Sequence, residues 1–172
     1  MDDFAEFFSA RRDVVFRAVL AIVGDAPTAE DAVAEAFTRA YARWRVVRTH
    51  ANPTAWVMLT ALNVARSWWR RRRREWLTAS HDTVAQSFVP PPADPLDAVL
   101  GRALASLPVR QRTVVALRIL ADLSAEETGQ ILGIAPATVH VHLHRALTAV
   151  RAAMTPLIDS QPTDLRNDHV DR

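Results

Sequence analysis

Residues 124–152, SAEETGQILGIAPATVHVHLHRALTAVRA, decide the fold through the placement of their helix caps and breaks. Ser124 with Glu127 three residues later predicts a capping box at the start of a short helix. Gly133 ends that helix, and after a three-residue turn Pro136 opens a longer amphipathic one. This spacing is typical of the DNA-binding helix-turn-helix, whose second helix lies in the major groove of DNA.

The second helix of this motif has two chemically different sides. Val139, Leu143 and Leu147 recur at helical spacing and are expected to face inward. The outward set supplies the candidates for contacts with bases and phosphates: Ala137, Thr138, His140, Val141, His144 and Arg145. Histidines four apart on a helix can bind zinc, but no cysteine or carboxylate lies nearby in the sequence to complete a site. We therefore expect no metal, and histidines at a DNA face instead.

Upstream of this motif, apolar residues again recur at helical spacing, and no alternating strand pattern appears. One helix is predicted over residues 3–23. A second is predicted to start at Thr28, whose hydroxyl caps it with Asp31 in a capping-box arrangement, and a third starts at Asn52-Pro53 and runs to about residue 76. The fold is therefore expected to be all-α.

The segment over residues 78–95 holds four of the ten prolines together with acidic residues, which predicts an extended acidic linker. The linker separates two small helical domains: an N-terminal helical bundle over residues 1–77 and a C-terminal helix-turn-helix domain over residues 96–158. Residues 159–172 are polar and are predicted to form a disordered tail.

Positive charge is concentrated in one segment of the chain. The 172 residues carry a net charge of only +2, yet residues 39–74 contain ten arginines and no Asp or Glu. Such a local excess attracts a polyanion, because arginine displaces the counterions condensed on phosphates. A solvated face and a membrane surface are the alternatives, and nucleic acid is the favoured partner.

Composition excludes several other classes of protein. Without cysteine there is no disulfide framework, thiol nucleophile or thiolate zinc site. The acidic N-terminus and the short apolar runs predict a cytoplasmic protein with no membrane insertion. No glycine-rich phosphate loop, HExxH pair or nucleophile motif is present, so we expect neither an enzyme nor a cofactor.

The third predicted helix also has two faces. Its apolar side, with Val57, Met58 and Leu62, is expected to lie in the core. On the other side a stripe recurs at spacings of four and three: Trp56, Thr60, Asn63, Ser67, Arg70 and Arg74. A tryptophan can stack on a base, an asparagine can pair with a base edge and arginines bind phosphates. We interpret this stripe as a surface for an unwound nucleic-acid strand, with a plain solvent-exposed face as the alternative.

Two blocks of the sequence together resemble the bacterial extracytoplasmic-function (ECF) sigma factors, the small two-domain specificity subunits of RNA polymerase. The first block comprises Thr28-Ala-Glu-Asp-Ala-Val-Ala-Glu-Ala-Phe37 and Asn52-Pro-Thr-Ala-Trp-Val-Met-Leu-Thr-Ala-Leu-Asn-Val-Ala-Arg66. The second runs from Leu104-Ala-Ser-Leu-Pro-Val-Arg-Gln-Arg through the helix-turn-helix to Leu143-His-Arg-Ala-Leu147. With the linker, the resemblance spans residues 5 to 155.

The resemblance implies roles for particular positions. Asp31, Glu35 and Phe37 match the helix that docks on the clamp helices of the largest polymerase subunit. The residues that match the part of the family that melts and binds the −10 promoter element are Trp56, Thr60, Asn63, Arg66, Ser67, Arg70, Arg71 and Arg74. The helix-turn-helix matches the domain that binds the −35 element, and the acidic linker matches the segment that enters the RNA exit path.

The function implied is that of an alternative sigma factor, which binds core RNA polymerase and promoter DNA and helps to open the duplex. An anti-sigma factor is a common partner in the family, although nothing in this sequence identifies one. The rival hypothesis is a dimeric helix-turn-helix repressor or activator that binds duplex DNA without polymerase, and it leaves the Trp56 and Asn63 stripe without a role.

The sequence departs from the family pattern at Ala34, at Gly129, where alanine is usual, and at residues 140–142, which are usually more cationic.

Overall fold

The computed structural model describes residues 2–78 and 95–158, and within these ranges it is built of helices without strands. The N-terminal helices are α1 (Asp2–Val23), α2 (Ala26–Ala42), α3 (Trp44–Val47) and α4 (Pro53–Thr78). The C-terminal helices are α5 (Pro95–Ser106), α6 (Val109–Val115), the π-helical turn η1 (Ala116–Leu120), α7 (Ala125–Leu132) and α8 (Pro136–Ile158). The prediction of an all-α fold is confirmed. The predicted linker and tail lie almost entirely outside the described residues.

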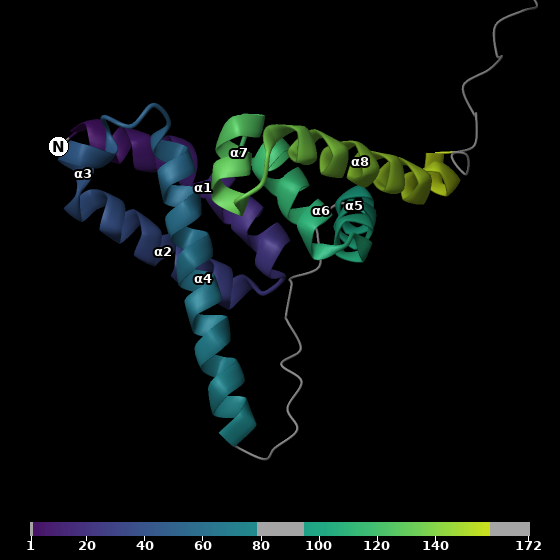
Figure 1. Cartoon of the computed structure of the whole chain (residues 1–172), viewed down its shortest axis with the longest axis horizontal. Coiled ribbons are helices and arrows are strands. Elements are labelled where there is room, and N and C mark those ends of the chain that lie inside the picture. The colour runs from purple at the N-terminus through teal and green to yellow at the C-terminus, as the bar shows by residue number, and fades with distance from the viewer. Residues whose placement is uncertain (1, 79–94, 159–172) are drawn as a thin grey trace, which may run out of the picture.

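In the N-terminal half, α1, α2 and α4 pack against one another around a shared apolar core (Figure 1). Val15 and Val19 of α1 and Val57 and Met58 of α4 are fully buried. One end of this bundle is closed by packed aromatic rings, which come from α1, α2 and α3: Phe4, Phe7, Phe8, Phe37, Tyr41 and Trp44. The burial of Val57 and Met58 fixes which side of α4 faces outward.

The start of α2 differs from the prediction. The helix begins at Ala26, and its N-cap is Asp25, whose carboxylate accepts a hydrogen bond from the Thr28 amide at 2.9 Å. Thr28 lies inside the first turn and is buried, so the predicted Thr28 and Asp31 capping box is wrong. Gly24, at φ +77°, turns the chain between α1 and this cap, a conformation that glycine adopts without strain. The cap at Asn52 is confirmed, because its Oδ1 accepts from the Thr54 and Ala55 amides.

In the C-terminal half, α7 and α8 form the predicted helix-turn-helix. Ser124 accepts from the Glu127 amide at 3.1 Å while the Glu127 carboxylate accepts from the Ser124 amide at 2.7 Å, so the predicted capping box is confirmed. Gly133 ends α7 in the left-handed region at φ +66°, and Pro136 opens α8. Val139 is fully buried against Val114 and Ala125, which fixes the orientation of α8.

Gly129 has a steric role that the sequence did not reveal. A Cβ atom at this position would lie 2.6 Å from the carbonyl oxygen of Ile134, a backbone atom that cannot move aside cheaply. The turn also depends on this close approach, since the Ile134 amide donates to the Gly129 carbonyl at 3.0 Å. Gly129 therefore permits this close turn, and it is not merely a weak point in the helix.

The two halves share one core in this structure. Leu117 and Leu123, from η1 and the turn after it, are fully buried in the same apolar cluster as Val15 and Val19 of α1. In Figure 1, α1 accordingly passes between α4 and the C-terminal helices, and α7 also contacts α4. Helix α6, which follows Pro108, continues into η1, a five-residue π-turn that brings Leu117 into this interface. Whether the halves are separate domains with the predicted boundaries stays a prediction.

Candidate nucleic-acid interface

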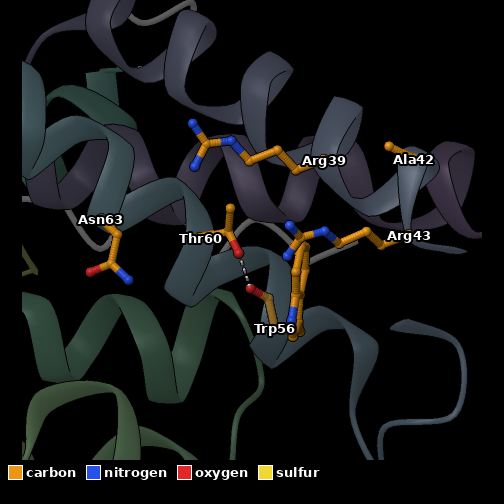
Figure 2. Close-up of a pocket in the computed structure, with 6 residues that line it drawn as sticks. All are labelled: Arg39, Ala42, Arg43, Trp56, Thr60 and Asn63. Atoms are coloured by element: carbon orange, nitrogen blue, oxygen red, sulfur yellow. Dashed lines mark hydrogen bonds between the residues drawn. The ribbon is translucent and has the colours of Figure 1, made fainter. Parts of the chain in front are cut away.

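A pocket of about 430 Å³ lies between α2 and α4, where the predicted stripe begins. Its lining comes from the C-terminal end of α2 and the outward side of α4: Arg39, Ala42, Arg43, Trp56, Thr60 and Asn63. Figure 2 shows Arg39 of α2 and Arg43, the residue that caps the end of α2, extending over the side of α4 that carries Trp56 and Thr60. The hydroxyl of Thr60 donates to the carbonyl oxygen of Trp56 at 2.8 Å, which leaves its oxygen lone pairs available as acceptors (Figure 2).

A second pocket, of about 390 Å³, continues along the same side of α4. Its lining includes Arg39 and Asn63 again, so these two residues stand between the two hollows; the full set is Glu35, Arg39, Asn63, Val64, Ser67 and Trp68. The Nε of Arg39 donates to Oε1 of Glu35 at 2.7 Å, one helical turn away. This ion pair holds the guanidinium in place while its terminal nitrogens remain as donors.

The structure brings most of the predicted −10 residues onto one face of α4. Trp56 and Thr60 are half-buried in the first pocket, Asn63 is exposed between the pockets, and Ser67 lines the second. Arg66 and Arg70 are exposed but line neither pocket, and the side chains of Arg71 and Arg74 lie outside the described residues. The face is therefore two-sided as predicted, with a solvent-accessible polar stripe opposite a buried apolar one.

Sequence reasoning missed Arg39 and Arg43 as members of this site. In the sequence both belong only to the basic segment, because the packing of α2 against α4 cannot be read from the sequence. Their spacing of four, about one helical turn, was the available signal. In the structure the stripe on α4 is therefore one side of a pocket, and Arg39 and Arg43 form the other side.

A separate groove of about 580 Å³ runs between α1 and α2. Aromatic rings form much of its lining, with Phe37 at its floor because that side chain is only 3% exposed. Asp13, Glu30 and Asp31 supply carboxylates at the same groove. Asp31 and Phe37, predicted as polymerase contacts, thus lie together here, whereas Glu35 lines the pocket beside α4 and pairs with Arg39.

The predicted −35 residues share the outward side of α8. All six are exposed: Ala137, Thr138, His140, Val141, His144 and Arg145. His142 is half-buried and does not belong to this face. Across residues 2–78 and 95–158, no three His, Cys, Asp or Glu side chains gather closely enough to hold a metal ion.

One carboxyl group beside α8 has a perturbed pKa. Hydrogen bonding to its own backbone amide, then to the Ser124 side chain, holds the pKa of Glu126 below its ordinary value, and the nearby His140 and Arg118 lower it further. Glu126 is exposed on α7, so an ionised carboxylate flanks the side of α8 that carries His140.

Comparisons with known proteins show the family of this chain. The family model of sigma-70 region 2 matches residues 7–75, and that of sigma-70 region 4 matches residues 97–150. The RNA polymerase sigma-E factor of Streptomyces coelicolor is 30% identical over 158 residues, covering 87% of this chain and 84% of that protein. The ECF RNA polymerase sigma factor SigL of Mycobacterium tuberculosis is 33% identical over 152 residues, with 84% of each chain covered.

Solved structures show the same fold. The sigma factor RpoE of Bartonella quintana, in complex with the anti-sigma factor NepR, superposes with a TM-score of 0.71 at 22% identity, covering 90% of this chain and 98% of that one. CnrH in complex with the cytosolic domain of CnrY gives a TM-score of 0.56 at 20% identity, with 92% and 89% covered.

A helical bundle that matches sigma-70 region 2, followed by a helix-turn-helix that matches region 4, is the architecture of a transcription initiation factor. The chain belongs to the ECF group of bacterial RNA polymerase sigma factors, and it is an alternative sigma factor. The rival hypothesis of a dimeric repressor has no support from these comparisons. No helix among the described residues is long and apolar enough to cross a membrane.

Proposed function

We propose that this sigma factor holds an unstacked base of the −10 element in the pocket between α2 and α4, while α8 binds the −35 element as duplex DNA. One observation carries the proposal: an indole, an amide and two guanidinium groups from two helices line a single pocket. Its volume lies within the range of roughly 300–1,000 Å³ that small-molecule sites occupy. In this pocket Trp56 stacks on the base, Asn63 pairs with its edge, and Arg39 and Arg43 bind the flanking phosphates.

The pocket is suited to the energetics of strand opening. Taking a base out of the duplex costs a few kcal/mol, and a preformed pocket offsets that cost because its walls need not be ordered at the time of binding. The buried Val57 and Met58 hold α4 in place, and the ion pair with Glu35 holds Arg39. The sigma factor thus supplies recognition and opening in the cytoplasm, and RNA synthesis belongs to the polymerase.

Core RNA polymerase is the proposed occupant of the groove between α1 and α2. Its aromatic floor suits an amphipathic helix, and Asp13, Glu30 and Asp31 suit a partner with basic side chains. The RpoE and CnrH structures are complexes with NepR and CnrY, and an anti-sigma factor that covered this groove would compete with the polymerase.

A crossed pair of substitutions tests these assignments. Asn63→Ala should lower the yield of open complexes in vitro by at least about fivefold, the value of one base-edge contact, while leaving core binding unchanged. Asp31→Ala should weaken core binding and leave the affinity of assembled holoenzyme for a single-stranded −10 oligonucleotide unchanged. Open complexes are counted by permanganate reactivity of unpaired thymines, and core binding by fluorescence anisotropy. An Asn63→Ala protein with full open-complex yield would contradict the pocket assignment.

A further inference from the structure

Val141 occupies the middle of the outward side of α8, one turn after Ala137 and one turn before Arg145. Its side chain is 48% exposed, whereas Val139, two residues earlier, is fully buried. Valine at an exposed helical position adds neither charge nor helix propensity. Neither charge nor helix stability therefore explains an apolar side chain at the centre of the face that the proposed function places in the major groove.

The side chains around Val141 exclude the usual purine contacts in this part of the helix. Between Pro136 and His144 there is no Arg, Lys, Asn or Gln. Arg and Lys are the residues that pair with guanine in the major groove, and Asn and Gln are those that pair with adenine. What this part of α8 presents are methyl groups and imidazoles, and the base-edge feature that an apolar side chain recognises is the C5 methyl group of thymine.

The distribution of charge around α8 also favours recognition through base edges. Arg145 is the first cation on α8, so the two turns before it gain little from attraction to the DNA backbone. The exposed Glu126 carboxylate lies near His140 and adds negative charge on that flank, where Arg118 is the nearby cation. Contacts with base edges must therefore contribute a larger share of recognition here than in a strongly basic recognition helix.

We propose that Val141 is a specificity-determining residue that selects a thymine of the −35 element by packing against its C5 methyl group. Ala137 extends the apolar surface by one turn, and Arg145 binds the backbone or a guanine and thereby sets the register of the helix. This inference rests on the proposed function, because it requires α8 to lie in the major groove.

The test uses holoenzyme assembled from core RNA polymerase and the full chain. A pool of promoter duplexes randomised in the upstream element is first selected for binding, and each thymine of the selected element is then replaced in turn by deoxyuridine, which lacks only the methyl group. With the unmodified chain, one replacement should weaken binding about fourfold, the value of burying one methyl group. With Val141→Ala the same replacement should change binding by less than about twofold, because the contact is already lost.

Val109→Ala is the matched control, because Val109 is 63% exposed at the start of α6, outside the helix-turn-helix. That variant should keep the full deoxyuridine penalty. A selected element that is sensitive to Arg145→Ala but indifferent to every thymine methyl would overturn the Val141 assignment alone, as would a penalty that persists in Val141→Ala. If no upstream element is selected and Arg145→Ala has no effect, the proposed role of α8 fails and the inference fails with it.

Discussion

The two faces proposed to contact DNA, on α4 and on α8, differ in shape. The outward side of α4 is walled by α2 and hollowed into pockets, whereas the outward side of α8 stands free. A pocket admits a base only when that base has left the stack, while a protruding helix reaches the edges of bases that remain paired. Under the proposed function, the shape of each surface therefore determines which form of DNA it binds: single-stranded DNA at α4 and duplex DNA at α8.

The region around α4 and the region around α8 also differ in charge. Ten arginines lie between residues 39 and 74 without an acidic residue, whereas Arg145 is the one cation in the first half of α8. Backbone attraction, which depends on salt, should therefore dominate at α4, and base-edge contacts should matter more at α8.

The largest effect is expected from Gly129→Ala. The new Cβ would collide with the Ile134 carbonyl oxygen and force the helix-turn-helix to rearrange, at a cost of about 1–3 kcal/mol in the free energy of unfolding. Binding of a −35 duplex should fall more than binding of a single-stranded −10 oligonucleotide, since the collision lies next to α8. Urea denaturation and fluorescence anisotropy measure the two quantities.

Gly101→Ala provides the matched control for this substitution. Gly101 lies inside α5, and a Cβ there would meet nothing within 4 Å. Alanine should stabilise this helix by up to about 1 kcal/mol through its higher helix propensity. If Gly129→Ala stabilised the protein in the same way, the steric role of Gly129 would be refuted.

The second prediction concerns the α2 wall of the pocket. Replacing Arg39 and Arg43 together by alanine should weaken binding of a single-stranded −10 oligonucleotide and reduce the slope of log affinity against log salt by about 1.4, for two lost phosphate contacts. Binding of a −35 duplex should not change. Arg17→Ala, an exposed arginine of α1 that lines none of the three hollows described above, is the control and should leave both slopes intact.

The smallest effect is expected at α8. Arg145→Ala should weaken binding of a −35 duplex and lower its salt slope by about 0.9, for one lost phosphate contact, with no change in single-strand binding. Arg102→Ala, on the exposed side of α5, serves as the comparison. If Arg145→Ala lowered the salt slope by about 3 or more, α8 would bind chiefly through electrostatic attraction. That result would contradict the proposed difference in binding between α4 and α8.

Local signals in the sequence predicted much of the fold. The capping box at Ser124 and Glu127, the end of α7 at Gly133 and the cap at Asn52 each depend on residues within three positions of one another. The two-sided character of α4 was also predictable, because helical periodicity alone separates Val57 and Met58 from the polar stripe.

Features that depend on packing between distant segments were not predictable in this way. Asp25 displaced Thr28 as a cap because the turn at Gly24 sets where the chain enters the helix. The role of Gly129 depends on a carbonyl five residues away that only the folded turn brings close. Arg39 joined the site, and Leu117 joined the core of α1, because helices far apart in the sequence pack side by side.

The most direct measurement scans a single-stranded −10 oligonucleotide with abasic sites, one position at a time, against holoenzyme carrying either the unmodified chain or Asn63→Ala. If the α2 and α4 pocket holds a base, one position should lose about tenfold in affinity when its base is removed, and that loss should become smaller in the Asn63→Ala holoenzyme, which keeps the Trp56 stacking but lacks the base-edge contact. Small and uniform losses at every position, or a large loss that Asn63→Ala leaves unchanged, would contradict the pocket as the site of base capture.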